Sequence, residues 1–386
     1  MAFQPEFTAT AANAGYTWWS HDIGGHMQGT HDVELAVRWL QFGVLSPINR
    51  LHSSMNPFSS KEPWAYGEPA ATIMRRYMRL RHRLIPTLYT AAWAAHAANV
   101  SVVRPMYHDA SREHGAYTHP NQYLLDEHLL VVPITAPLEQ SSHLATARAW
   151  LPVGERVDVF SGLRYRGSRE VTLARTLEAY PVLARAGAVV PLDADPMSHA
   201  GDAPTELELL VIPGTGESTL AEDDGSAAPE RGLVTFRQSL EVREGGGADI
   251  TLTISASGAP LPDRRIDPSA GVQDAEDVSV DGGVYASFAS LPADAENLSP
   301  AGLSVDLGVV RLSEGLTIRI CGARPAEAFD AQRVFELLQQ AELAFEVKRQ
   351  VWVAVEENRL LDALSVELPR ELHDALSEQL AAVVAW

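Results

Sequence analysis

The hydrophobic pattern changes character twice along this chain of 386 residues, and these changes restrict its fold. Residues 1–98 alternate between strand-like and helix-like segments, an order typical of a parallel sheet with helical crossovers. The expected elements are strands at 16–21 and 44–48, a helix capped by Thr30 and stopped by Gly43, and a helical pattern over 69–93 that Pro86 kinks or splits. Two βα units cannot close a barrel, so this pattern fits an open sheet or part of an eight-stranded barrel.

From residue 99 onward the pattern consists of short β-forming runs separated by turn residues, which is typical of an antiparallel sandwich. The runs lie at 102–106, 129–134, 147–151, 156–160, 170–173 and 188–192. A second β-rich block extends from Leu207 to about Cys321, with the clearest alternation at 249–254 and 316–320. This block predicts a second sandwich.

The last block, residues 329–386, contains no glycine and has leucine and valine at helical spacing. It predicts two or three amphipathic helices, with Pro369 as a break between them.

Composition excludes several classes of partner. A formal net charge of −20 argues against nucleic acid, which requires clustered Lys and Arg. Cys321 is the only cysteine, so no disulfide can form within the chain and a reducing compartment is expected. The first residues lack the features of a secretory signal, and no apolar run approaches the roughly 20 residues that span a bilayer. We therefore expect a cytoplasmic protein without a membrane partner.

A cluster of chemically active side chains lies at residues 15–26, where two indoles, two imidazoles, a carboxylate and a glycine pair occur together. A strand at 16–21 would place Asp22 at its carboxyl end, where barrel enzymes build active sites. Asp22, His26 and His52 all follow predicted strands and can converge on one pocket. Trp18 or Trp19 can supply an aromatic wall, although only one of two adjacent residues on a strand points inward. The alternative is that both indoles are core and the polar groups are loop surface.

Two metal sites are open alternatives. His21, His26 and His31 recur every five residues, which suits neither a helix face nor a strand face. The run from Glu222 through Asp223 and Asp224 can chelate calcium, but it lacks further spaced ligands and fits a solvated turn better. No Walker loop, dinucleotide fingerprint or serine elbow is present, and we expect no cofactor.

Several co-linear motifs together resemble one known family. FQPEFTAT at 3–10, WWSHDIGGH at 18–26, RWLQFG at 38–43, SPINRLH at 46–52 and KEPW at 61–64 are similar to the late barrel strands of glycoside hydrolase family 31, which contains α-glucosidases and α-xylosidases. Segments at 103–106, 151–154, 181–191 and 222–225 resemble landmarks of that family's C-terminal β-domains. The resemblance covers roughly residues 1–325 and does not extend to the closing helical block.

The resemblance implies an α/β plus all-β fold: the C-terminal part of a (β/α)8 barrel, two β-sandwich domains and a helical tail. The corresponding bounds are 1–98, 99–194, 195–325 and 326–386. It also implies a retaining mechanism that uses two carboxylates about 5 Å apart. In the family both belong to earlier barrel strands, so we expect no catalytic residue in this chain and place both carboxylates upstream of Met1.

The resemblance further implies which residues bind the sugar. Asp22 matches the aspartate of the family's Asp-Ile-Gly-Gly loop, and His52 closes its Arg-x-His segment, which begins at Arg50. His26 stands where many relatives have phenylalanine, and Trp19 is a weaker choice for a pocket wall. The implied ligand is an α-linked oligosaccharide or glycoside, and a missing N-terminal segment or a homo-oligomer is the implied partner. The alternatives are a non-catalytic carbohydrate-binding or structural remnant and a metal-dependent hydrolase built on the histidines.

Overall fold

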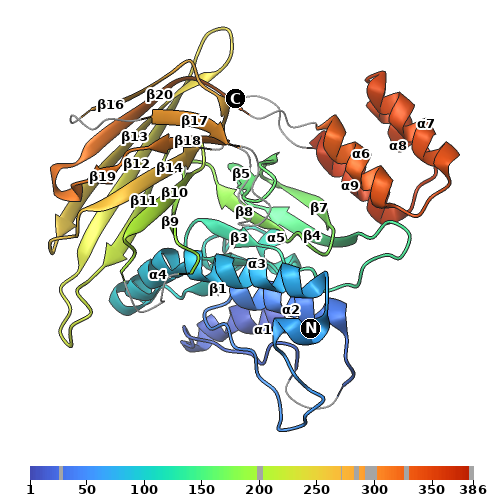
Figure 1. Cartoon of the computed structure of the whole chain (residues 1–386), viewed down its shortest axis with the longest axis horizontal. Coiled ribbons are helices and arrows are strands. Elements are labelled where there is room, and N and C mark those ends of the chain that lie inside the picture. Colours follow the sequence, from blue (N-terminus) through green and yellow to red (C-terminus); the bar gives the residue numbers. More distant parts are fainter. Residues whose placement is uncertain are drawn as a thin grey trace.

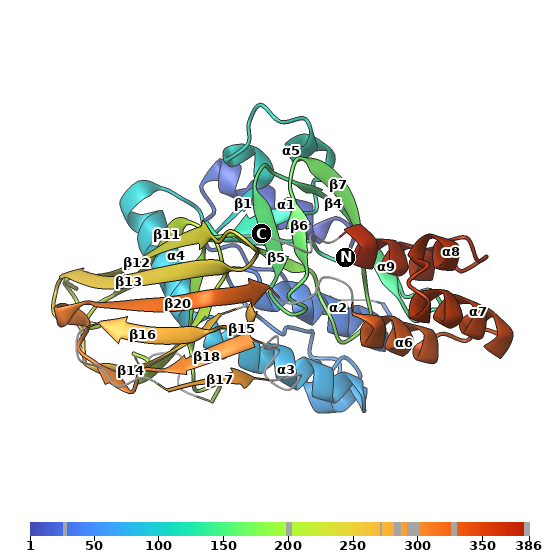
Figure 2. The ribbon, with the colours of Figure 1, turned by 90° about the horizontal axis from the view of Figure 1, so that it is seen from above.

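The computed structural model describes residues 1–25, 29–197, 203–270, 272–281, 287–291, 302–325 and 330–381. Figure 1 shows a sandwich of long strands on one side, a group of short helices on the opposite side, and two smaller sheets between them. The N-terminal helices lie beneath these sheets. Seen from above, the long-stranded sandwich and the C-terminal helices again occupy opposite ends of the molecule (Figure 2).

The N-terminal part is helical. Its helices are α1 (Gln4–Thr10), α2 (Val33–Val44), α3 (Ala70–Arg83) and α4 (Ile85–Ala98), with short 3-10 turns at Ala11–Ala14 and Pro63–Tyr66. Pro86 lies in the first turn of α4, which confirms the predicted split of the 69–93 segment. The expected cap of α2 at Thr30 is wrong, because the Asp32 carboxylate accepts the Leu35 N–H at 2.9 Å. Gly43 does not end this helix, because the helix extends to Val44. A Cβ at position 43 would lie 2.3 Å from Cδ1 of Ile23.

The two strands expected in this part are absent as strands. Segments 16–21 and 44–48 contain no ladder, and a single parallel bridge joins Ile23 to Leu51. Residue 44 belongs to α2, and the next two residues form a turn in which the N–H of Leu45 donates to Phe42 O at 3.2 Å. A strand of a parallel sheet forms hydrogen bonds with neighbouring strands on both sides. Among the described residues of this part, the only such pairing is the bridge between Ile23 and Leu51, so no ladder forms.

The proximal β-sandwich packs a six-stranded sheet against a two-stranded sheet. The first has the order β1 (Val103–Pro105), β2 (Tyr123–Leu125), β3 (Leu129–Val131), β8 (Val182–Arg185), β5 (Glu155–Asp158) and β6 (Arg164–Arg166). The second pairs β4 (Ala145–Leu151) with β7 (Arg169–Arg175), and the short helices η3 (Met106–His108) and α5 (Gly115–Thr118) lie between β1 and β2 in the sequence. Buried Leu130, Trp150, Leu173 and Leu183 form part of their shared core. The strand predictions for this part are confirmed.

The distal β-sandwich contains the longest strands. One sheet has the order β17 (Ser287–Leu291), β18 (Gly302–Asp306), β14 (Arg264–Ala270), β10 (Glu206–Val211) and β9 (Val189–Asp193), and β19 (Val309–Val310) pairs with β14. The other has the order β11 (Gly216–Glu222), β12 (Gly232–Val242), β13 (Ala248–Gly258), β20 (Leu316–Pro325) and β15 (Val272–Asp274), and β16 (Asp277–Asp281) pairs with β20. The short helix η4 (Leu312–Glu314) precedes β20. The strands predicted at 249–254 and 316–320 are confirmed, and β9 joins this sandwich although it precedes residue 195.

The helical tail contains α6 (Ala331–Gln340), α7 (Phe345–Glu356), α8 (Leu360–Leu364) and α9 (Arg370–Ala381). The expected count of two or three is wrong, because a short turn of helix forms at α8; Pro369 does precede α9 as predicted. Val334, Val351 and Leu372 are buried in one core with Leu144 and Ala174 of the proximal sandwich. Within the described ranges, no helix combines the length and apolar character required to cross a bilayer.

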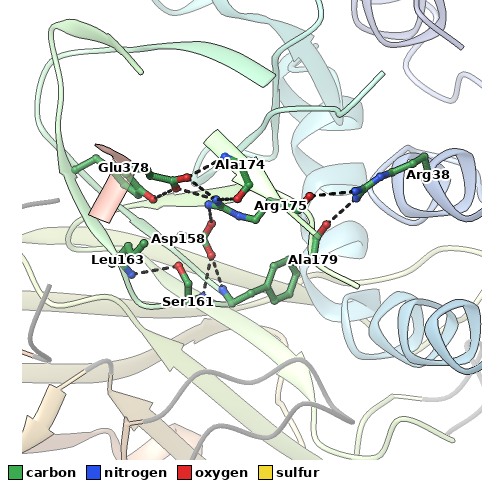
Figure 3. A network of polar contacts seen from close by, with 10 residues as sticks. Arg38, Asp158, Ser161, Leu163, Ala174, Arg175, Ala179 and Glu378 are labelled. Atoms are coloured by element: carbon green, nitrogen blue, oxygen red, sulfur yellow. Dashed lines mark hydrogen bonds and ion pairs between the residues drawn. The ribbon is translucent and has the colours of Figure 1, made fainter. Parts of the chain in front are cut away.

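A buried ionic network joins the tail to the proximal sandwich (Figure 3). Glu378 of α9 accepts hydrogen bonds from Tyr165 Oη at 2.6 Å, from the Ala174 N–H at 2.9 Å and from Arg175 Nη1 at 2.7 Å. The other end of the Arg175 guanidinium donates to Asp158 Oδ2 at 2.7 Å. All the charges of this network are buried, so each requires the others to compensate its lost hydration.

Replacement of Glu378 by alanine should release the tail. The change leaves Arg175 buried with one carboxylate instead of two, and breaking a buried pair in this way costs about 3–5 kcal/mol. Limited proteolysis should therefore cleave residues 330–381 faster in Glu378→Ala, and calorimetry should show an earlier transition. Glu356→Ala, which removes an exposed carboxylate of α7, is the control and should behave like the wild type. Equal proteolysis of all three proteins would contradict the role of this network.

Candidate functional site

The candidate site is centred on the turn that follows Asp22. Gly24 and Gly25 both have positive φ, +81° and +80°, and the Gly25 N–H donates to Asp22 O at 2.9 Å. This turn depends on the glycine pair, since other residues rarely adopt this backbone. Lys61 lies over the turn and donates from Nζ to Gly24 O at 2.8 Å. The turn is thus held by its own backbone hydrogen bond and by the Lys61 side chain.

The parallel bridge brings two of the predicted site residues together. The Ile23 N–H donates to Arg50 O at 3.2 Å, and the Arg50 guanidinium forms an ion pair with the Asp22 carboxylate. The side chain of Asp22 is 27% exposed and that of Arg50 is 50% exposed, so the pair faces solvent. His52 is half-buried and follows Arg50 two residues along the same segment. A carboxylate, a guanidinium and an imidazole therefore belong to two neighbouring segments, while His26 lies outside the described residues.

The two adjacent tryptophans differ in environment. Trp18 is 52% exposed, so the alternative in which both indoles are core is wrong. Trp19 is half-buried, and its ring packs edge-on against Phe7 and Tyr16 with centroid separations of 5.0 and 5.8 Å. Its Nε1 is buried and has no hydrogen-bond partner among the described residues. The role of Trp19 as a pocket wall stays a prediction.

His21, which was grouped with the possible metal ligands, is a structural residue. Its Nδ1 accepts from Trp39 Nε1 at 3.0 Å, so its proton is on Nε2, which donates to Ser46 Oγ at 3.1 Å. The ring stacks on Phe42 with centroids 4.4 Å apart. Burial lowers the pKa of His21 to about 4, an effect that Asp22 opposes and Arg50 reinforces. No local pattern signals these contacts, because the partners lie on α2 and in the turn after it.

The metal alternatives do not agree with this geometry. Both ring nitrogens of His21 are engaged, and His31 stacks on Tyr66 with centroids 5.0 Å apart. Across the described part of the chain, no three acidic, histidine or cysteine side chains are grouped as metal ligands. The histidine-based metal hydrolase is therefore not supported.

The acidic run 222–224, at the end of β11 and in the turn after it, is divided among separate partners, contrary to the calcium alternative. Glu222 is buried and accepts from Arg264 Nη1 at 2.7 Å. Asp223 accepts from Trp93 Nε1 at 3.0 Å and from the Tyr89 hydroxyl, whereas Asp224 accepts from the Ser226 N–H at 3.1 Å. The expected solvated turn is correct for Asp224 but wrong for Glu222, because the latter still belongs to β11.

Comparison with known families identifies the first half of the chain. Residues 1–91 match the TIM-barrel domain of glycosyl hydrolases family 31, and residues 99–190 match the C-terminal domain of the same family. These parts of the chain therefore belong to glycoside hydrolase family 31.

Two curated relatives illustrate how much of the family is represented. The chain is 30% identical over 219 residues to the alpha-xylosidase of Saccharolobus solfataricus, covering 55% of this chain and 29% of that protein. It is 32% identical over 222 residues to the neutral alpha-glucosidase C of Mus musculus, covering 56% of this chain and 24% of that protein. The chain thus spans less than a third of the length of these relatives.

Solved structures extend the similarity of fold into the distal sandwich. A family 31 dextranase of Flavobacterium johnsoniae, complexed with isomaltotriose, matches with a TM-score of 0.68 at 23% identity and covers 82% of this chain and 41% of its own. A family 31 alpha-xylosidase of Xanthomonas citri matches with a TM-score of 0.56 at 22% identity, over 78% of this chain and 32% of its own. The architecture is therefore a barrel segment followed by the β-domains of this family.

The neutral state of His21 predicts a pH-dependent stability. Between pH 6.5 and 4 the unfolded imidazole binds a proton that the folded one does not, so the free energy of unfolding should fall as the pH falls. His21→Gln should reduce the loss between pH 7 and 4.5 by roughly 2–3 kcal/mol, measured by denaturant unfolding with tryptophan fluorescence.

Two other histidines bear on the interpretation of this measurement. Burial also lowers the pKa of His128 to about 4, but that residue is present in both proteins and cancels in the comparison. His143→Gln replaces a more exposed imidazole and is the control. The prediction fails if His21→Gln and wild type lose equal stability over this pH range.

Proposed function

We propose that this chain supplies the sugar-binding side of the active site of an α-glycosidase. The observation that carries the proposal is the pairing of the Asp22 turn with the Arg50–His52 segment through the Ile23–Leu51 bridge. Sugar hydroxyls both donate and accept hydrogen bonds, and these segments offer a carboxylate acceptor, guanidinium donors and an imidazole. Membership of glycoside hydrolase family 31 supports the same assignment.

Asp22 is assigned to binding and not to bond cleavage. It forms an ion pair with Arg50, and carboxylate oxygens in this setting are suited to accept hydrogen bonds from a sugar. Retaining glycosidases require two carboxyl groups about 5 Å apart, one nucleophile and one acid/base. We propose that this pair comes from barrel strands outside the given sequence.

A partner surface for those strands is part of the proposal. Large apolar side chains of the barrel segment are strongly exposed: Phe3, Tyr16, Trp18, Met55, Phe58 and Trp64, with Met55 at 100% and Phe58 at 90%. Exposed apolar groups of this kind mark protein contacts. We also propose a cytoplasmic location, which the single cysteine supports.

Binding tests the assignment of Asp22. Asp22→Asn removes the negative acceptor and should weaken the binding of an α-linked oligosaccharide such as isomaltotriose at this site about tenfold, measured by calorimetric titration. Glu170→Gln, which breaks a more exposed ion pair with Arg148 in the proximal sandwich, should leave binding unchanged. Equal binding by wild type and Asp22→Asn at a site near the barrel segment would contradict the assignment.

Hydrolysis tests the assignment of catalysis. The 386-residue chain alone should not turn over aryl α-glucosides or aryl α-xylosides, since the expected nucleophile and acid/base lie elsewhere. Addition of a polypeptide that carries the preceding family 31 barrel strands should restore turnover. Robust turnover by the chain alone, abolished by replacing one of its own carboxylates, would show that the catalytic pair is inside this sequence.

A further inference from the structure

A large cavity lies away from the Asp22 turn, where α4 meets the distal sandwich. Its volume is about 730 Å³, and it is lined by α4, the end of β11, the turn at 223–225 and the segment 259–264. Ligand-binding cavities commonly measure about 300–1,000 Å³. Helix α4 packs on β9 and β11, so the walls belong to elements held by the core of the molecule.

One wall of the cavity offers an oriented aromatic ring. Tyr89 is 43% exposed, and its hydroxyl donates to Asp223 Oδ2, which also accepts from Trp93 Nε1 at 3.0 Å. These two residues are one helical turn apart on α4, so a single carboxylate fixes both side chains. The remaining lining is largely apolar and includes Pro86 and Leu261. A fixed ring beside apolar side chains suits the C–H face of a sugar ring.

The polar lining contains a buried ion pair with unused hydrogen-bonding capacity. Arg264 is 2% exposed and Glu222 is 7% exposed, and they are joined by one bond of 2.7 Å. Nε and Nη2 of Arg264 and Oε2 of Glu222 have no hydrogen-bond partner among the described residues. Buried groups of this kind cost free energy unless a ligand or water pairs with them. Two donor atoms of Arg264 and one acceptor atom of Glu222, both residues of the cavity lining, therefore lack a partner among the described residues.

The charge of the lining narrows the class of ligand. Four carboxylates, those of Glu222, Asp223, Asp224 and Glu230, line the cavity and disfavour phosphate and other anions. The buried guanidinium disfavours a cation beside it, and the carboxylates of the turn are already bonded to Tyr89, Trp93 and Ser226. A neutral polyhydroxylated molecule avoids both penalties, because each hydroxyl donates and accepts.

We propose that this cavity is a second carbohydrate site, which binds a neutral saccharide of one or two rings with Tyr89 against one sugar face. The site is separate from the Asp22 turn and does not depend on catalysis. It would hold one part of a long glucan on the distal sandwich while another part reaches the barrel segment. Retention of substrate by a second site raises the effective concentration at the first.

Titration of the full chain with maltose tests the proposal. The Asp22→Asn protein is used throughout, so that binding at the barrel segment does not obscure the cavity. We expect saturable binding of one maltose, about tenfold weaker after Tyr89→Ala and within about threefold of the parent after Tyr89→Phe, which keeps the ring. Tyr117→Ala, which removes an exposed ring from the proximal sandwich, is the matched control and should not change binding.

A second variant and a second probe complete the test. Glu230→Ala removes an exposed carboxylate of the lining without disturbing the core, and should weaken maltose binding about threefold even if Tyr89→Ala proves unstable. Calcium alone should produce no binding heat. The proposal is overturned if the Asp22→Asn protein does not bind maltose, if Tyr89→Ala and Glu230→Ala bind as tightly as their parent, or if calcium binds in place of the sugar.

Discussion

The architecture depends on two buried guanidinium groups at the segment that follows β7. Arg175, at the end of that strand, pairs with Asp158 of β5 and Glu378 of α9. Arg38 of α2 donates to the backbone of the same segment, to Ala179 O at 2.8 Å (Figure 3) and to Thr176 O at 2.9 Å. Barrel segment, sandwich and tail therefore meet at the five consecutive residues 175–179. Since an unpaired buried charge costs several kcal/mol, each part stabilises the placement of the others.

Which elements could be predicted from the sequence depends on how local their stabilising contacts are. The strands that were predicted in both sandwiches follow from local alternation, because each is antiparallel to a partner close in the sequence or buries one face in a core. The expected strands at 16–21 and 44–48 did not form, since a parallel ladder depends on neighbours that arrive through long connections. The helix start at Asp32 and the turn of helix at α8 were missed because caps and short helices depend on single contacts.

The candidate sites divide in the same way. The turn at Gly24 and Gly25 was predictable because positive φ selects glycine. The pairing of Asp22 with Arg50 was not, because it depends on the bridge between two segments that are 28 residues apart in the sequence. His21 looked like a ligand and is instead a neutral packing residue between α2 and the following turn. The run at 222–224 stood out in the sequence, but the cavity that it lines beside Tyr89 was not predictable, since helix α4 and strand β11 are joined only in the folded chain.

The amino-acid sequence by itself determined the order of the domains, the family to which residues 1–91 and 99–190 belong, and the residue types available for binding sugar. These properties rest on local periodicity and on co-linear motifs, which need no knowledge of distant contacts. Only the tertiary structure decided which charges are paired, which histidines are buried and where cavities form. Those features depend on desolvation and on long-range contacts, and both arise only when separate segments pack together.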